Sequence, residues 1–266
     1  MKLQKLLSLT RQAIDAYGMI EENDKIAVGI SGGKDSLTLL YALSHLRKFY
    51  PDKFDIVAVT VDLGFDNLNL EEIREFCKKL GVEYQIIKTQ IAEVVFQVRK
   101  ESNPCSLCAK MRKGALNDAI KELGCNKIAL GHHFDDVIET ILMGMLYSGK
   151  IETMMPKLHS QNFDGMELIR PLYMVKEEDI KDWRDYNKLH FIQCACRFTE
   201  NCATCGGGRG SKRDEMKELV AEFRKNSGTL IEGNIFKSVH DINLHRVIGY
   251  HKNGDRYNFL DDYDEN

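Results

Sequence analysis

Apolar, β-branched runs alternate with amphipathic stretches along the first half of the chain. Nearly continuous apolar runs are typical of parallel strands buried on both faces, and helical spacing between them predicts the covering helices. Strands are expected over residues 25–30, 54–62, 82–87 and 126–133. Helices are expected over residues 70–80 and 108–123, and a further helix should start directly after residues 32–33 and continue over 39–48. This alternation predicts an α/β fold with a doubly wound, mostly parallel sheet.

The remaining pattern predicts how the chain is divided. Helices are expected over residues 134–147, 177–186, 214–225 and 235–247, with a loop over 149–157, a short strand over 168–172 and an acidic, frayed tail over 261–266. We therefore expect an N-terminal helix (1–22), an α/β domain (23–190) and a C-terminal extension (191–266) that joins a Cys-rich loop to helices.

A Gly-Gly turn joins the first predicted strand to the next helix, in the sequence Ile-Ser-Gly-Gly-Lys-Asp-Ser of residues 30–36. Gly32 and Gly33 let the backbone approach an anion closely, and the helix start offers free N–H groups to it. Lys34 adds positive charge, while Ser31 and Ser36 add hydroxyl donors. The string fits neither G-x-x-x-x-G-K-[ST] nor G-x-G-x-x-G. It predicts a phosphate loop, the other interpretation being a tight turn that carries a lysine.

Further polar residues follow the second and fourth predicted strands. Ligands of such sheets bind beyond the carboxyl ends of the strands, where Asp62, His132, Asp135 and Asp136 are expected. The last three could position Mg²⁺, ATP or a nucleophile, although acidic residues in a first helical turn also complement the helix dipole. Asp62 could assist a nucleotide or be a solvated carboxylate. His133 is expected to be structural.

Eight cysteines are present, and two groups of them carry candidate chemistry. Cys105 and Cys108 stand at the start of a basic helix, an environment that lowers thiol pKa values. In a cytosolic chain this C-x-x-C spacing indicates metal or redox chemistry. The second group could form a zinc site alone or complete a site begun by the first; it comprises Cys194, Cys196, Cys202 and Cys205. The basic, Gly-rich residues 206–213 suit a phosphate backbone or a solvated loop.

Composition narrows the partners and the compartment. The chain has 266 residues, of which 43% are hydrophobic and 29% charged, with a net charge of −3. A polyanion would therefore need a local basic patch. With no long apolar run and no secretory signal, we expect no membrane contact and a cytoplasmic location.

The Ser-Gly-Gly-Lys-Asp-Ser string resembles the pyrophosphate loop of the N-type ATP pyrophosphatases, which have the adenine-nucleotide α-hydrolase fold. With the Cys105–Cys108 pair, residues 130–136 and later segments, the chain over roughly 1–247 resembles tRNA 2-thiocytidine synthetases of the TtcA type. The resemblance implies ATP-dependent thiolation of an anticodon-loop cytidine in tRNA. It also implies Mg²⁺, a [4Fe-4S] cluster held by three cysteines, and a sulfur donor, either a cysteine desulfurase or inorganic sulfide.

The resemblance also assigns roles to individual residues. Catalytic roles fall to Asp35, Arg112 and Asp136. The nucleotide would be held by Ser31, Gly32, Gly33, Lys34, Asp35, Ser36, Asp62, His132 and Asp135. The cluster ligands would be Cys105, Cys108 and Cys205, with Cys194, Cys196 and Cys202 as candidates for the third position.

Other classes of function stay open. One is a 2-thiouridine synthetase of the same superfamily; another is a lysidine-type ligase, or an RNA-binding protein with a structural zinc. A homodimer is suggested by the family likeness alone. Residues 248–266 match no pattern that assigns a role.

Overall fold

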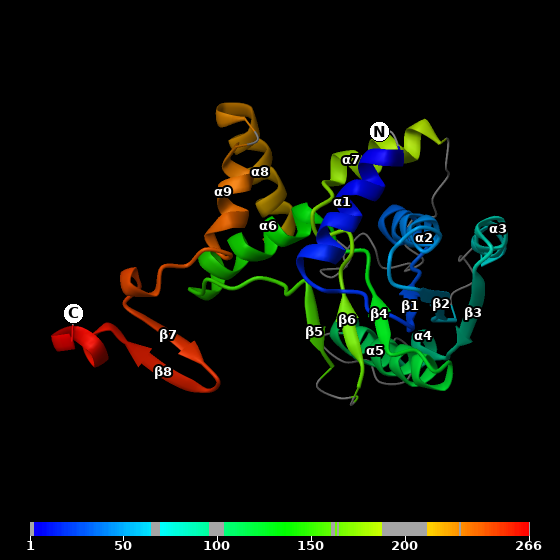
Figure 1. The fold of residues 1–266 in the computed structure, drawn as a ribbon. Coiled ribbons are helices and arrows are strands. Elements are labelled where there is room, and N and C mark those ends of the chain that lie inside the picture. Colours follow the sequence, from blue (N-terminus) through cyan, green and yellow to red (C-terminus); the bar gives the residue numbers. More distant parts are fainter. Residues whose placement is uncertain are drawn as a thin grey trace.

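The computed structural model describes residues 3–64, 70–95, 104–160, 163, 165–187, 212–228 and 230–265. Within these ranges one sheet of six strands has the order β3-β2-β1-β4-β6-β5 (Figure 1). The strands are β1 (Asp24–Gly29), β2 (Phe54–Asp62), β3 (Glu83–Lys88), β4 (Lys127–Ala129), β5 (Lys157–His159) and β6 (Glu167–Ile169). All pairs are parallel except β5–β6. The predicted doubly wound, mostly parallel sheet is confirmed.

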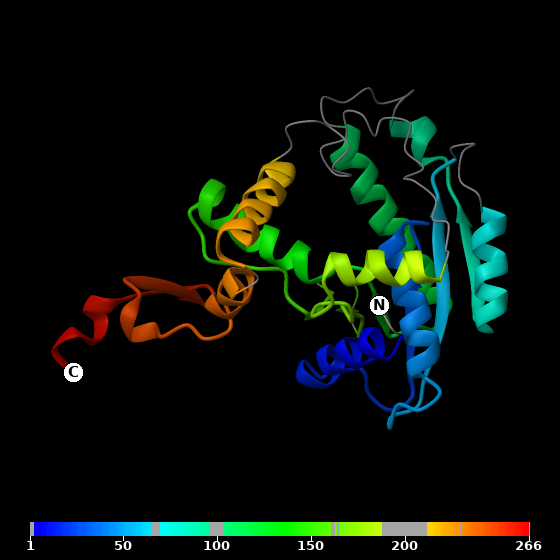
Figure 2. The same ribbon diagram turned by 90° about the horizontal axis from the view of Figure 1, so that it is seen from above.

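Helices cover both faces of this sheet (Figure 2). They are α1 (Leu3–Ala16), α2 (Lys34–Leu46), α3 (Leu70–Leu80), α4 (Ile91–Glu93), α5 (Pro104–Glu122), α6 (Phe134–Met143), α7 (Glu177–Tyr186), α8 (Lys212–Ser227) and α9 (Leu230–Ser238). None of them, within the described ranges, combines the length and apolar character that crossing a membrane requires.

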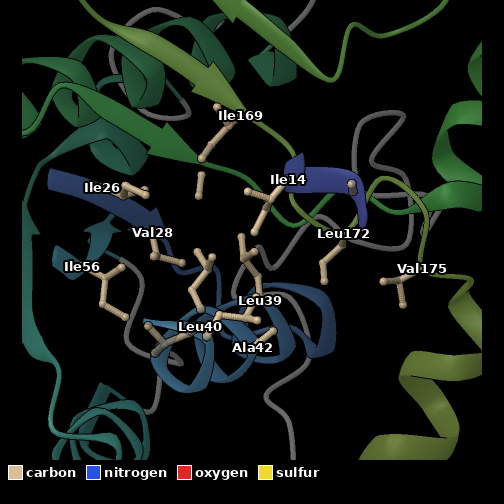
Figure 3. Close-up of a cluster of buried hydrophobic side chains, with 14 of the residues drawn as sticks. Ile14, Ile26, Val28, Leu39, Leu40, Ala42, Ile56, Ile169, Leu172 and Val175 are labelled. Carbon is tan, nitrogen blue, oxygen red and sulfur yellow. The ribbon is translucent and has the colours of Figure 1, made fainter. Parts of the chain in front are cut away.

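Side-chain alternation along the central strands divides the core between the two faces. Ile26 and Val28 of β1 pack with α1 and α2, whose Ile14 and Leu39 point into the same cluster (Figure 3). Ala27, between them, packs on the other face in a second cluster that includes Ile120 of α5. Because both faces are covered, the strand is a continuous apolar run, as a buried parallel strand requires.

Several predicted boundaries are wrong. The first helix ends at Ala16 instead of residue 22, because Gly18 takes a left-handed φ of 53°. Helix α2 begins at Lys34, directly after the Gly-Gly turn as expected, but it ends at Leu46 and not at residue 48. The helix expected over 235–247 lies over Leu230–Ser238. The tail expected to fray forms a 3₁₀ helix, η5 (Phe259–Glu265).

An antiparallel hairpin near the C-terminus was not predicted. It consists of β7 (Gly249–Lys252) and β8 (Asp255–Asn258), and Asn253 and Gly254 form its turn with φ values of 55° and 93°. An Asn-Gly pair with two positive φ angles favours two-residue hairpin loops, so the sequence did carry a signal. Both views show this hairpin extending away from the sheet and its helices (Figures 1 and 2).

Candidate active site

Two loops meet where the strand order of the sheet reverses. β1 and β4 are neighbours, with β2 on the far side of β1 and β6 on the far side of β4. The loop after β1 leads into α2, and the loop after β4 leads into α6. A Cβ on Gly131 would lie 2.9 Å from the carbonyl carbon of Asp35 and 3.0 Å from the amide nitrogen of Ser36. The two loops therefore touch through backbone, at the position where open α/β sheets bind ligands.

The loop after β1 is shaped by the hydroxyl of Ser36. This oxygen accepts a hydrogen bond from the Ser31 amide at 3.2 Å and donates one to the Gly33 carbonyl at 3.0 Å. Gly32 takes a left-handed φ of 81°, which a side chain would strain. Gly33 is the N-cap of α2 and provides no side-chain cap. No N-cap side chain therefore covers the N–H groups of the first turn, the groups that a phosphate loop uses to bind an anion.

Lys34 lies between two carboxylates. Its Nζ is 3.0 Å from Oδ1 of Asp35 and 3.0 Å from Oε1 of Glu177, the first residue of α7. Partial burial opposes the lysine charge, but these carboxylates raise the pKa of Lys34 above its usual value. Partial burial likewise opposes the Glu177 charge, yet hydrogen bonds from Lys181 and Lys34 lower the pKa of Glu177 to about 2. Sequence reasoning missed Glu177, because its pattern is that of an ordinary acidic first turn.

His133 is buried among the acidic residues, with 4% of its surface exposed. Its Nε2 is 3.8 Å from Oδ1 of Asp35 and 3.5 Å from Oδ2 of Asp136, and its Nδ1 is 3.8 Å from Oδ2 of Asp135. The Nδ1 atom has no hydrogen-bond partner among the described residues. The His133 amide donates to Oδ2 of Asp136 at 3.0 Å and so caps α6. His133 thus lies between Asp35 in the first turn of α2 and the two aspartates in the first turn of α6.

The two neighbouring aspartates have different surroundings. Asp135 accepts hydrogen bonds from the Glu177 amide at 2.7 Å and from Nη2 of Arg224 at 2.8 Å, which ties α6 to α7 and α8. Asp136 has Nη1 of Arg213 at 3.4 Å. The same guanidinium lies 3.5 Å from Glu139, a residue whose burial raises its pKa to about 7. Asp135 therefore anchors helices, whereas the longer contact of Asp136 with Arg213 leaves this carboxylate better able to bind a ligand.

His132 is linked through Arg170 to the segment that precedes β5. Nε of Arg170 donates to Nδ1 of His132 at 3.3 Å, and the same guanidinium donates to the Met155 carbonyl. Burial lowers the pKa of His132, and the Arg170 charge lowers it further. His132 is therefore neutral, and its Nδ1 accepts the hydrogen bond from Arg170. Through its other bond, to the Met155 carbonyl, Arg170 holds the segment of residues 149–157 near His132.

Asp62 and Cys108 lie near the carboxyl end of β2. Asp62 accepts a hydrogen bond from the Gly64 amide at 2.9 Å. Cys108, half-buried near the start of α5, packs in a cluster with Val61 and Ile91. Arg112 follows one turn later on α5 and is exposed. Cys105 is the second residue of α5, three positions before Cys108, a spacing that puts two positions on one helix face.

The rest of the predicted thiol set lies outside the described residues. This holds for Cys194, Cys196, Cys202 and Cys205, and for the side chain of Cys105. Among the described residues no group of three or more His, Cys, Asp or Glu side chains has a metal-binding arrangement. Cys77 and Cys125 are buried in the core, and burial raises the pKa of both, that of Cys77 to about 11. Both are unreactive packing residues.

The reversed strand order, the uncapped helix start and the Ser-Gly-Gly-Lys-Asp-Ser loop define a PP-loop protein, and residues 3–197 match the PP-loop domain family. The chain is 36% identical over 244 residues to the tRNA-cytidine(32) 2-sulfurtransferase of Pseudomonas fluorescens (strain Pf0-1), covering 91% of this chain and 85% of that protein. It is 39% identical over 225 residues to the protein of the same name from Syntrophotalea carbinolica, covering 83% and 82%. The chain belongs to the tRNA-cytidine(32) 2-sulfurtransferase family.

Solved structures that are similar over most of the chain include a tRNA thiolase. It is the U34-tRNA thiolase NcsA from Methanococcus maripaludis with its [4Fe-4S] cluster, with a TM-score of 0.66 at 24% identity. The match covers 91% of this chain and 82% of that one, and it supports the fold. The resemblance seen in the sequence motifs is confirmed at the level of the family by the match to the PP-loop domain and by the 2-sulfurtransferase relatives.

Proposed function

We propose that the protein is an ATP-dependent tRNA sulfurtransferase that converts a cytidine of the anticodon loop to 2-thiocytidine. The proposal rests mainly on the contact of Gly131 with the start of α2 at the strand-order reversal, in a member of this family. His133, two residues after Gly131, lies between Asp35 and Asp136. Cys108 of α5 packs in a cluster with Val61 near the carboxyl end of the neighbouring strand β2, which places a thiol near the same edge. ATP and tRNA as substrates make the cytoplasm the expected location.

The first half of the reaction activates the cytidine. Its C2 oxygen attacks the α-phosphorus of ATP, pyrophosphate leaves, and the oxygen becomes part of an adenylate that can depart as AMP. Ser31, Gly32, Gly33 and Ser36 supply donors and backbone space around the departing pyrophosphate, and Lys34 offsets its charge. Preorganised donors of this kind act where charge develops, so the loop lowers the barrier instead of only binding ATP.

Carboxylates and one arginine serve the reacting centre in this proposal. Asp35 and Asp136, on either side of His133, would supply the oxygen ligands of Mg²⁺, a hard cation that prefers them. Arg112, an exposed residue of α5, would contact the adenylate or the tRNA. Asp62 and the neutral His132 would contact the nucleotide, whereas Asp135 acts through its bonds to α7 and α8.

The second half replaces oxygen by sulfur. A sulfur nucleophile adds at C2, AMP leaves with the original oxygen, and a proton is released. A [4Fe-4S] cluster held by three cysteines would supply an iron that can bind and present sulfide. Cys105 and the half-buried Cys108, three positions apart on α5, would be two of the cluster ligands. Cys205 is the proposed third ligand. Sulfur would come from a cysteine desulfurase or from inorganic sulfide.

Iron and acid-labile sulfide in anaerobically purified protein test the cluster. We expect about four irons and equal sulfide per chain for wild type. Cys105→Ser should lose both, since a ligand is removed, while the matched control Cys125→Ala should keep them, because this thiol packs in the core. Zinc without iron in the wild-type protein would contradict the cluster and favour a structural metal site. Thiolation by an iron-free protein would favour persulfide chemistry.

A homodimer formed through the C-terminal hairpin and η5 is part of this proposal. Exposed apolar side chains there are Ile248, directly before the hairpin, and Phe259, Leu260 and Tyr263 of η5. Lys252 and Arg256 of the hairpin precede an acidic tail, so a two-fold arrangement can pair these basic side chains with the tail of the partner. Sedimentation velocity should show a wild-type dimer and a Leu260→Glu monomer. A wild-type monomer at tens of micromolar would contradict this part.

A further inference from the structure

The phosphate-loop lysine already has an anionic partner from outside its own loop. Lys34 Nζ has three N–H donors, and two carboxylate oxygens lie 3.0 Å from it, one from Asp35 and one from Glu177. Asp35 is the next residue in the chain, so its contact is local. Glu177 comes from α7, and only the fold brings it to Lys34. The lysine that would bind the pyrophosphate end of ATP is therefore partly neutralised before ATP arrives.

The Glu177 carboxylate is fixed from two directions. Its backbone amide donates to Asp135 at 2.7 Å, which holds the first turn of α7 against α6. Its Oε2 accepts a hydrogen bond from Lys181, one turn later on α7, at 3.0 Å. The side chain of Glu177 is 23% exposed, and that of Lys34 is 22% exposed. The ion pair is thus partly shielded from solvent, and screening weakens it less than it would a surface pair.

We propose that Glu177 is a positioning residue that occupies the phosphate-binding side of Lys34 in the nucleotide-free enzyme and is displaced by the pyrophosphate end of ATP. This inference rests on the proposed function only in taking ATP as the ligand of the loop. A phosphate oxygen that approaches Lys34 meets the Glu177 charge at the same ammonium group. Glu177 therefore weakens the binding of both ATP and pyrophosphate, and it favours release of pyrophosphate after the adenylate forms.

Lys181 has an opposing influence on the same carboxylate. It shares Glu177 with Lys34, each at 3.0 Å, and so draws part of the negative charge away from the loop. Removing Lys181 leaves Glu177 with Lys34 as its main partner and should strengthen their pairing. Removing the Glu177 charge and removing the Lys181 charge should hence change nucleotide affinity in opposite directions. If Glu177 served only to support the fold, both changes would weaken binding.

Isothermal titration of the full-length protein with pyrophosphate and with a non-hydrolysable ATP analogue tests this proposal. Glu177→Gln should tighten both affinities by about three- to tenfold, the equivalent of a partly shielded ion pair. Lys181→Met should weaken both by about two- to threefold, less because Lys181 is 48% exposed. The matched control Glu178→Gln changes a neighbouring carboxylate that is 56% exposed and should leave both affinities as in wild type.

Pyrophosphate affinity and melting temperature together separate competition of Glu177 with phosphate from a purely structural role. Unchanged or weaker pyrophosphate binding by Glu177→Gln, in a variant with the wild-type melting temperature, overturns the proposal. A lower melting temperature together with weaker binding assigns Glu177 a structural role and overturns it as well. The sulfurtransferase function is judged separately, by thiolated nucleoside in tRNA. Opposite affinity changes in Glu177→Gln and Lys181→Met, with no thiolation by wild type, would keep this inference and remove that function.

Discussion

Replacing Gly131 by alanine tests whether the contact between the two loops forms the site. The φ of Gly131 is not in the left-handed region, so an alanine can adopt this backbone conformation. The substitution is unfavourable only because the added methyl group would clash with neighbouring atoms. The new Cβ would meet Asp35 and Ser36 backbone atoms at 2.9, 3.0 and 3.1 Å. Backbone cannot rotate away as a side chain can. The start of α2 and the loop after β4 must therefore separate by a few tenths of an ångström.

The expected cost of Gly131→Ala follows from this overlap. Forcing one methyl group into a tightly packed place costs about 1–3 kcal/mol, and each 1.4 kcal/mol carried into binding is a tenfold loss of affinity. Because the overlap falls on the first turn of α2, we expect ATP affinity to fall about tenfold or more along with stability. Calorimetric unfolding and titration with a non-hydrolysable ATP analogue measure both.

A matched control separates this effect from a general response to adding a methyl group. Gly233 lies in α9, and apart from the backbone of that helix no heavy atom of the described residues lies within 4 Å of the position that a Cβ would take there. Gly233→Ala should therefore keep ATP affinity and gain up to about 1 kcal/mol of stability. Equal melting temperatures and affinities for Gly131→Ala and Gly233→Ala would show that Gly131 is not in close contact with the backbone of Asp35 and Ser36.

Two further predictions concern buried charge. Burial raises the pKa of Glu139 from 4.5 to about 7, so its ionisation opposes folding as pH rises through that range. Glu139→Gln should therefore increase stability at pH 8 by up to about 3 kcal/mol and by much less at pH 5, measured by urea unfolding at both values; an equal change at both would contradict it. Lys127, with 2% of its surface exposed, contacts Asp24 at 2.9 Å and Glu167 at 3.0 Å. Lys127→Met removes the cation that faces the buried Asp24 carboxylate, while Glu167 keeps Lys157 at 3.1 Å. The change should cost about 3–5 kcal/mol by the same assay, whereas a loss below about 1 kcal/mol would show that the Lys127–Asp24 pair is not desolvated.

The sheet and the phosphate loop could be predicted from the sequence because local rules decide them. A strand buried on both faces needs a continuous apolar run, as in residues 54–62, and a turn with a left-handed φ at Gly32 needs glycine. The strand β5 was missed because it has three residues, none of them fully buried, so no alternation marks it. The hairpin at Asn253–Gly254 was missed although its turn pair was visible, because its strands lack an apolar face.

The partners of the site residues could not be predicted in the same way. Glu177 and Lys34 are far apart in sequence, and nothing local to α7 distinguishes Glu177 from an acidic residue that complements a helix dipole. The division of labour between Asp135 and Asp136 likewise depends on Arg224 and Arg213, which only the packing of α8 on α6 brings near. Sequence indicates which residues gather at a sheet edge, and packing decides which of them pair.

The most direct test of the sulfurtransferase account is the nucleoside content of tRNA after reaction with the purified protein. Anaerobically purified wild type would be incubated with unmodified tRNA, ATP, Mg²⁺ and sulfide, and the digested tRNA analysed by mass spectrometry. The account predicts 2-thiocytidine that depends on ATP and is lost in Cys105→Ser but kept in Cys125→Ala. Thiouridine, lysidine or unchanged cytidine in the wild-type reaction would contradict it.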